Sequence, residues 1–224
     1  MMKTAVVIGS TGGIGSELVK SLKSDGYTVV GVSKSGDIKC DLTELSDIHS
    51  TITSIRESVE QIDLLINAAG IATYENLIDV TDQDIQDAFM VNTIAPAIFI
   101  RELLPKMTSD SLVLNIGSGA GTIPMRGRTI YCATKYALRG LSLSLNEEYK
   151  DKSPKFCLIT LGSTLTDFGN MSIEEKKAEF TRGKAYFPVD FVIKKLMEVV
   201  RNPNPDNEIV LFPGDYGFGE WKKP

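Results

Sequence analysis

Short runs of Val, Ile, Leu and Ala recur along the chain, and several of them stop at a glycine or an asparagine. Apolar runs of this length without polar alternation are typical of β-strands that are covered on both faces, as in a parallel sheet. The pattern predicts strands at residues 3–8, 28–32, 38–40, 63–66, 111–116, 155–160 and 208–212.

Between these runs the apolar residues recur every three or four positions, which predicts helices with one buried face. In the first of them Ile14, Leu18 and Leu22 share a face, and Asp25-Gly26 stops the helix. The other predicted helices cover residues 43–59, 81–106, 131–149 and 188–201. This alternation indicates a single α/β domain spanning residues 1–224, a doubly wound Rossmann-type fold with a mostly parallel seven-stranded sheet.

One connection is too short for this pattern. Only about five residues separate the strand at 28–32 from the strand at 38–40, whereas a crossover between parallel strands takes a dozen or more and usually contains a helix. We therefore expect either a tight extended loop or an irregular sheet here, with an unusually open site beside it.

The helix predicted at 81–106 contains a start signal and an interruption. Thr81 followed by Asp82 and Asp84 indicates an N-cap with an acidic first turn. Pro96 has no N–H, and its ring clashes with the carbonyl four residues earlier, which belongs to Asn92. We expect the Asn92 carbonyl to leave the helical hydrogen-bond pattern and to take another partner, such as a water.

Composition and charge narrow the class of protein. Hydrophobic residues make up 42% of the chain and charged residues 24%, which is ordinary for a soluble protein with a sizeable core. The net charge of −5 argues against a nucleic-acid partner. No apolar run approaches the roughly 18 residues of a membrane span, and the N-terminus leads straight into a strand without signal-peptide architecture. We expect a cytoplasmic protein with no membrane partner.

The cysteines and the single histidine suggest no chemistry of their own. Cys40, Cys132 and Cys157 lack metal-ligand spacing and are expected to be reduced, buried thiols, so no metal site is predicted. His49 lies in a polar helical stretch, which argues against a Ser-His-Asp hydrolase because that triad requires a histidine at the active site.

The loop from Gly9 to Gly15, with the sequence Gly-Ser-Thr-Gly-Gly-Ile-Gly, follows a predicted strand and opens a predicted helix. In that context glycines let backbone N–H groups approach a pyrophosphate at the helix N-terminus, where the dipole favours negative charge. The loop therefore predicts a dinucleotide site.

The end of the strand at 28–32 bears on the choice of dinucleotide. NAD-binding proteins usually place an acidic residue there to hold the ribose hydroxyls, whereas this chain has Ser33-Lys34-Ser35. A lysine between two hydroxyls suits a 2′-phosphate, so we expect NADPH to be preferred over NADH. The alternative is a solvated loop in which Asp37 accepts the ribose hydroxyls.

Polar residues follow other strands, and a parallel sheet brings such positions to one edge. They are Asn67, Ser118 and Thr166, and Tyr131 and Lys135 follow Ser118 on the next helix. Residues four apart lie on the same helix face. A lysine ammonium beside a phenol is expected to lower the phenol's pKa from about 10, which would let Tyr131 exchange protons near neutrality.

In this order and at these spacings, the motifs resemble those of the short-chain dehydrogenase/reductase superfamily over nearly the whole chain. The resemblance implies an oxidoreductase that transfers a hydride between NADP(H) and a carbonyl or secondary alcohol substrate. It implies that Tyr131 is the general acid and base, that Lys135 lowers its pKa and holds the nicotinamide ribose, that Ser118 binds the substrate oxygen, and that the main-chain carbonyl of Asn92 holds a water.

The resemblance also implies which residues bind the cofactor along the edge of the sheet. They are Gly9, Ser10, Thr11, Gly13, Ile14, Gly15, Ser33, Lys34, Ser35, Asp41, Leu42, Asn67, Ala68, Ala69, Gly70, Tyr131, Lys135, Gly162, Thr164 and Thr166.

The chain departs from the family pattern in places. Leu161 stands where the family usually has proline, and the segment after Thr166 is short, so the substrate pocket is expected to be open. Arg126 and Arg128 are either ligands for an acidic substrate or solvated side chains. Met125, Phe168, Met171 and Phe187 either line this pocket or belong to the core.

The resemblance further implies a homodimer or homotetramer packed through the helices at 81–107 and 131–149. An alternative from another class is a non-enzymatic dinucleotide-sensing regulator or scaffold on the same fold. Such a protein would be free to lose Tyr131 or Lys135, and both are present.

Overall fold

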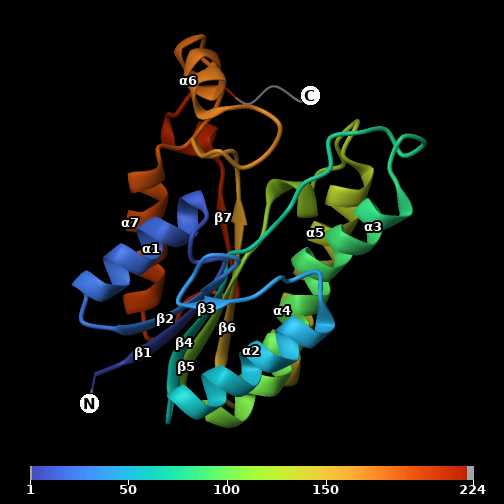
Figure 1. Cartoon of the computed structure of the whole chain (residues 1–224). Helices are drawn as coiled ribbons and strands as arrows, with labels where there is room; N and C mark the ends of the chain where they lie inside the picture. The colour runs from blue at the N-terminus through green and yellow to red at the C-terminus, as the bar shows by residue number, and fades with distance from the viewer. Residues whose placement is uncertain (1, 221–224) are drawn as a thin grey trace.

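The sheet is the frame on which the other elements are placed. A computed structural model describes residues 2–220 and contains a seven-stranded sheet in the order β3-β2-β1-β4-β5-β6-β7 (Figure 1). Every pair of neighbours is parallel, which confirms the fold predicted from the sequence. The strands are β1 (Thr4–Ile8), β2 (Thr28–Ser33), β3 (Ile38–Lys39), β4 (Ile62–Asn67), β5 (Met107–Ile116), β6 (Lys155–Leu161) and β7 (Glu208–Leu211).

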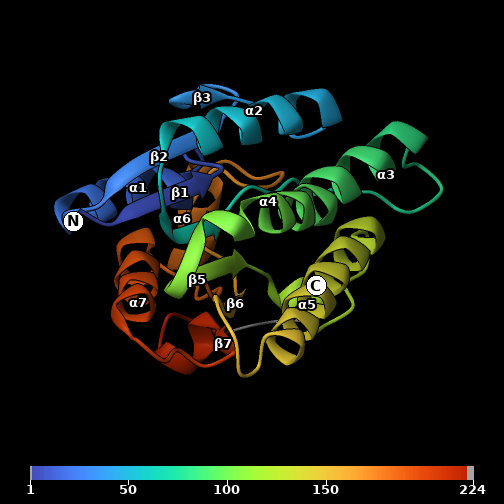
Figure 2. The same ribbon diagram turned by 90° about the horizontal axis from the view of Figure 1, so that it is seen from below.

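Helices cover both faces of the sheet, as the two views show (Figures 1 and 2). One face carries α1 (Gly13–Ser24) and α7 (Val189–Arg201). The other face carries α2 (Leu45–Ser58), α4 (Ala95–Leu103) and α5 (Thr129–Glu148). Alternate residues of β1 separate the two cores, because Ala5 and Val7 pack with α1 and α7 while Val6 and Ile8 pack with α2 and α4.

The order of the strands reverses between β1 and β4, since β2 and β3 lie on one side of β1 and β5 to β7 lie beyond β4. In open α/β sheets ligands bind at the carboxyl ends of the strands at such a switch point. The loop after Ile8 and the loop after Asn67 therefore flank the position where a ligand is expected.

The short connection between β2 and β3 is a tight loop without a helix, which is one of the two forms expected from the sequence. β3 pairs with β2 only at Val32–Ile38 and Ser33–Lys39. The Asp37 carboxylate closes the loop by accepting a hydrogen bond from the Gly31 N–H at 3.0 Å.

The predicted long helix is built from four successive pieces. They are α3 (Asp82–Phe89), the π-helix η1 (Met90–Ile94), α4, and the 3₁₀-helix η2 (Leu104–Lys106). The Thr81 hydroxyl caps α3 by accepting from the Asp84 N–H at 3.1 Å, as predicted. The backbone changes to π-type pairing, with the Ala95 N–H donating to Met90 O, immediately before Pro96. The helix is therefore irregular around Asn92, and a free Asn92 carbonyl stays a prediction.

The segment Asp82–Lys106 is long and apolar enough to span a membrane by length and composition, with a mean hydropathy of 1.3 over an 18-residue window. The expectation that no such stretch exists was wrong, because a window of this size tolerates a few polar positions. Half of the window is buried inside the protein, where Phe99, Ile100 and Leu103 belong to the core. Its apolar character is therefore explained by packing against the sheet.

Candidate active site

The glycine loop is shaped by contacts that no side chain could tolerate. Gly9 has φ +88°, and a Cβ on Gly15 would lie 2.0 Å from the Gly9 carbonyl oxygen. A Cβ on Gly13 would lie 2.7 Å from the Thr166 side chain. These glycines let the turn after β1, the start of α1 and the loop after β6 lie against one another.

The residues present at this loop fit a pyrophosphate. Helix α1 begins after Gly12, has no side-chain cap and carries no acidic residue in its first turn. Its first N–H groups and its positive dipole end are therefore free for an anion. Ser10 Oγ and Asn67 Oδ1 are buried without a hydrogen-bond partner among the described residues. Neither residue lines the cavity, and Ser10 Oγ faces Gly31 of β2, so the fit to a pyrophosphate rests on the N-terminus of α1 and its glycines.

Tyr131, Lys135 and Ser118 lie together at the other end of the same cavity. Tyr131 and Lys135 are in the first two turns of α5 and are only 6% and 4% exposed. The Lys135 ammonium lies 5.9 Å from the centre of the Tyr131 ring and donates to the Ile116 carbonyl at 3.2 Å. The spacing of four residues therefore places both groups on one buried face, as predicted.

The pKa of Tyr131 differs from the prediction. Burial raises it to about 12, and hydrogen bonding with the Ser118 side chain only partly opposes the shift. Burial also lowers the pKa of Lys135, to about 8. Burial disfavours the charged form of each group, so the phenol is held in its protonated form.

Asn92 ties the π-helix to the active-site helix through its side chain. Its Nδ2 donates to Thr134 Oγ1 at 2.9 Å and to the Ile71 carbonyl at 2.8 Å, and its Oδ1 accepts from the Ile71 N–H at 2.9 Å. Thr134 in turn donates to the Tyr131 carbonyl at 2.8 Å. Asn92 therefore positions the helix turn that carries Tyr131, and it does so without lining the cavity.

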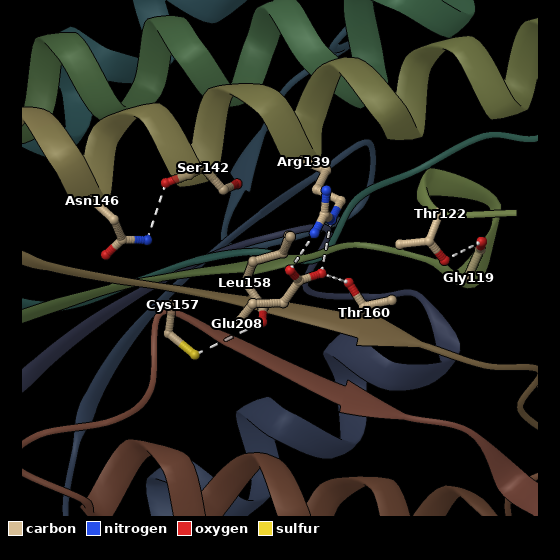
Figure 3. A network of polar contacts seen from close by, with 9 residues as sticks. All are labelled: Gly119, Thr122, Arg139, Ser142, Asn146, Cys157, Leu158, Thr160 and Glu208. Atoms are coloured by element: carbon tan, nitrogen blue, oxygen red, sulfur yellow. Dashed lines mark hydrogen bonds and ion pairs between the residues drawn. The ribbon is translucent and has the colours of Figure 1, made fainter.

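A polar network fastens α5 to the sheet (Figure 3). Arg139 makes a bidentate pair with Glu208 of β7, with N–O distances of 2.9 and 2.7 Å, and Thr160 of β6 donates to the same carboxylate at 2.6 Å. The Arg139 guanidinium lowers the pKa of Glu208. Since α5 carries Tyr131 and Lys135, this anchor fixes their position relative to the strand ends.

Asn67 lies beneath the site. It donates to Asn115 at 2.8 Å, and Asn115 donates to Ser142 of α5 at 2.9 Å.

At the adenosine end, the predicted phosphate-binding residues are paired with one another. Lys34 Nζ lies 2.7 Å from an oxygen of Asp41, and Thr11 donates to Ser33 Oγ at 3.0 Å. Ser35 is exposed and donates weakly to Thr11 at 3.4 Å. The side chains of Ser33, Lys34 and Ser35, which the sequence predicted to bind a phosphate, therefore lie together beside the loop between β2 and β3. The Lys34 side chain is 74% exposed and able to turn toward a ligand.

A single cavity of about 1140 Å³ joins both ends, which is larger than the roughly 300–1,000 Å³ of common ligand pockets and leaves room for a dinucleotide and a substrate together. Four predicted site residues, Ser10, Ser35, Asn67 and Asn92, do not line it. Those that do are Gly9, Thr11, Gly13, Ile14, Gly15, Ser33, Lys34, Asp41, Leu42, Ala68, Ala69, Gly70, Ser118, Tyr131, Lys135, Gly162, Thr164 and Thr166.

The candidates for the substrate pocket divide into two groups. Met125, Phe168 and Met171 line the cavity, and the Phe168 ring lies 6.1 Å from that of Tyr131. Phe187 does not line the cavity, because it is fully buried in an aromatic cluster, where its ring centre lies 5.1 Å from that of Phe191. Phe187 therefore follows the core alternative, which the sequence left open because an apolar residue in a segment without periodicity gives no sign of which way it faces.

Helix α6 (Ile173–Thr181) was missed by the sequence reasoning, although its residues line the cavity. Its start is marked by a capping box in which Ser172 and Glu175 bond reciprocally, and the Ser-x-x-Glu pattern could have revealed it. Lys176 of this helix is buried and donates to the carbonyls of Thr166 and Phe168, so it holds the loop after β6.

The comparisons with known proteins agree with this geometry. A family model described as short chain dehydrogenase matches residues 3–177. Dehydrogenase/reductase SDR family member 11 from Homo sapiens is 30% identical over 175 residues, which cover 66% of this chain and 67% of that protein. The 3-oxoacyl-(acyl-carrier-protein) reductase FabG from Haemophilus influenzae is 28% identical over 193 residues, which cover 79% of this chain and 80% of that protein.

Among solved structures, a short chain dehydrogenase from Burkholderia cenocepacia in complex with NADP is similar, with a TM-score of 0.83 at 23% identity. The match covers 93% of this chain and 96% of that one. With the family model spanning most of the sequence and relatives named as dehydrogenases and reductases, the chain belongs to the short-chain dehydrogenase family and is an oxidoreductase.

Proposed function

We propose that this oxidoreductase reduces a carbonyl group, and in the reverse direction oxidises a secondary alcohol, with NADP(H) as its cofactor. The observation that carries the proposal is the arrangement in one cavity of Tyr131, Ser118 and Lys135 at one end and the uncapped N-terminus of α1 at the other. The first set can move a proton at a substrate oxygen, and the second can hold a pyrophosphate.

When bound, the nicotinamide cofactor supplies or accepts the hydride. Tyr131 holds the matching proton on its hydroxyl and gives it to the carbonyl oxygen as that oxygen gains negative charge, so that hydride and proton together convert the carbonyl to an alcohol. Ser118 donates to the same oxygen and stabilises the developing charge. A pKa of about 12 keeps Tyr131 protonated at neutral pH, and an alkoxide is a stronger base than a phenolate, so Tyr131 can donate its proton in the reduction.

The cofactor is held along the sheet edge by the glycine loop and Lys135, and Lys34 makes NADPH the preferred form. Asp37, the alternative ribose acceptor, accepts a hydrogen bond from Gly31 and does not line the cavity, which favours the lysine. Among similar structures, an alcohol dehydrogenase from Thermococcus sibiricus is complexed with 5-hydroxy-NADP and a 4-hydroxyisoleucine dehydrogenase with NADH. The fold therefore accommodates dinucleotides with and without the 2′-phosphate.

The protein assembles as a homodimer or homotetramer through α4 and α5. Support comes from large exposed side chains, because Ile94 of η1, directly before α4, is 40% exposed and Tyr136 of α5 is 45% exposed. Light scattering on the purified protein gives a mass of two or four chains if this is correct, and the mass of one chain contradicts it.

The experiment that tests the function is a screen of ketones and aldehydes with NADPH, in which oxidation of the cofactor is followed optically. The proposal expects turnover with at least one carbonyl substrate and a lower KM for NADPH than for NADH. Tight NADPH binding without turnover on any carbonyl or alcohol would instead indicate a dinucleotide-sensing regulator.

A further inference from the structure

Arg128 is a cation in the cavity without a carboxylate partner. Five of the seven arginines, all except Arg126 and Arg128, pair with Asp or Glu side chains. Among residues 2–220 no carboxylate lies within 4.0 Å of the Arg128 guanidinium, which is half-buried and lines the cavity. Arg126 is exposed and does not line it.

The contacts of Arg128 orient its guanidinium and leave its donors free. The guanidinium carbon lies 4.6 Å from the centre of the Tyr74 ring, and Nη1 lies 3.7 Å from Met125 Sδ. Stacking on an aromatic ring holds the plane of the fork, and sulfur is a weak acceptor. Most of the five N–H donors therefore remain available for a ligand in the cavity.

The position of Arg128 relates it to the reacting groups. It is the residue before α5, three positions ahead of Tyr131, and α5 has no side-chain cap and no acidic residue in its first turn. Arg128 and Tyr74 are close enough to Tyr131 to shift its pKa in opposite directions. An anion at Arg128 would also face the positive end of the α5 dipole.

The other charges on α6 and the following loop give no partner for Arg128. Glu179 already pairs with Arg182 at 3.1 Å and with Lys184 at 3.6 Å. The lining also contains the cations of Lys135, Lys176, Arg182 and Lys184 and the carboxylates of Glu179 and Asp215, so with Arg128 positive charge is in excess. This part of the cavity therefore favours a negatively charged molecule.

We propose that Arg128 binds the carboxylate of the substrate, so that the enzyme acts on oxo acids and hydroxy acids, with the carbonyl at Tyr131 and Ser118 and the carboxylate at the guanidinium fork. An aligned guanidinium matches a carboxylate in bidentate geometry. This inference rests on the proposed function, because it names the substrate class of the same site.

The test compares acids with their methyl esters. A series from 2-oxo to 6-oxo straight-chain acids, each paired with its ester, is titrated calorimetrically into the protein loaded with NADP⁺, which cannot reduce them. Turnover of the same compounds is assayed separately with NADPH. The variants are Arg128→Met, Arg128→Lys and, as the matched control, Arg126→Met. Thermal unfolding and NADPH affinity of each variant confirm that the fold and the cofactor site are intact.

We expect at least one acid to bind the wild-type protein and Arg126→Met at least about tenfold more tightly than its ester, since a charge-assisted pair contributes about 1.5–3 kcal/mol. Arg128→Met should lose this preference, and Arg128→Lys should keep only part of it. Equal binding of acids and esters by the wild type, or an unchanged preference in Arg128→Met, would overturn the inference. If the enzyme reduces an ester as well as the matching acid, the inference about Arg128 is overturned and the proposed function still stands. If the acid binds as expected and no compound is turned over, only the proposed function is contradicted.

Discussion

The ammonium of Lys34 lies 2.7 Å from the Asp41 carboxylate at the open adenosine end of the cavity. The pairing holds the pKa of Asp41 at about 2, so the carboxylate is ionised at every pH at which the enzyme would work. Asp41 keeps the lysine beside the loop between β2 and β3, where a 2′-phosphate would compete with the carboxylate for it. The preference for NADPH proposed above therefore depends on Lys34.

Replacing Lys34 with methionine should raise the KM for NADPH about tenfold and leave the KM for NADH nearly unchanged. The expected size follows from the loss of one charge-assisted contact, about 1.5 kcal/mol. Lys39→Met is the matched control, because Lys39 is an exposed lysine on β3. An equal effect of Lys34→Met on both cofactors would mean that Lys34 does not recognise the phosphate.

Lys135 should reduce the stability of the protein at neutral pH. Its pKa falls from 10.5 to about 8 on burial, which corresponds to a cost of about 3 kcal/mol, and its hydrogen bond to Ile116 returns about 1 kcal/mol. The free energy of unfolding of Lys135→Met at pH 7 should therefore be about 2 kcal/mol higher than that of the wild type, although the variant should lose activity. A less stable variant in urea titrations would contradict this explanation.

The same shift gives a pH dependence with a definite sign. Below about pH 8 Lys135 is charged in the folded and in the unfolded protein, so the folded protein bears the full cost of burying the ammonium. Between about 8 and 10.5 the unfolded chain binds more protons than the folded one, and stability rises with pH. The advantage of Lys135→Met should shrink to about 1 kcal/mol at pH 9. Comparing the two proteins at each pH cancels the opposite contributions of Tyr131 and Cys157, whose pKa values are raised to about 12.

Lys176 should position the loop after β6. Replacing it with methionine removes the donor from the carbonyls of Thr166 and Phe168, and Thr166 packs against Gly13 in the cofactor loop. We expect the free energy of unfolding to fall by about 1–3 kcal/mol and the KM for NADPH to rise more than kcat falls. Lys177→Met, at an exposed position of the same helix, should change neither quantity. A fall in kcat alone would instead place Lys176 in the chemical step.

The sequence was informative wherever local chemistry decides the structure. Glycines after an apolar run predicted the turn at Gly9–Gly15, and the missing N–H of Pro96 predicted the irregular backbone seen at η1. The spacing of Tyr131 and Lys135 predicted a shared helix face, and both side chains are buried on it. In each case the responsible interactions lie within a few residues of one another.

The sequence was less informative where packing from distant segments decides. The raised pKa of Tyr131 comes from desolvation by the whole surrounding cavity, which no local motif records. Phe187 is buried by Phe191, Tyr216 and Phe218, and the partner of Asp41 is a lysine across the short loop. Helix α6 has little amphipathic pattern, so only its capping box marks it.

The most direct test of the account is Tyr131→Phe, which removes one hydroxyl from a buried ring and keeps its packing. NADPH oxidation with the best carbonyl substrate and NADPH affinity are measured side by side for this variant and the wild type. We expect kcat to fall by about 10³-fold or more with the Kd for NADPH changed less than about threefold. Turnover at the wild-type rate in the variant would contradict the assignment of Tyr131 as the proton donor, and with it the proposed reaction.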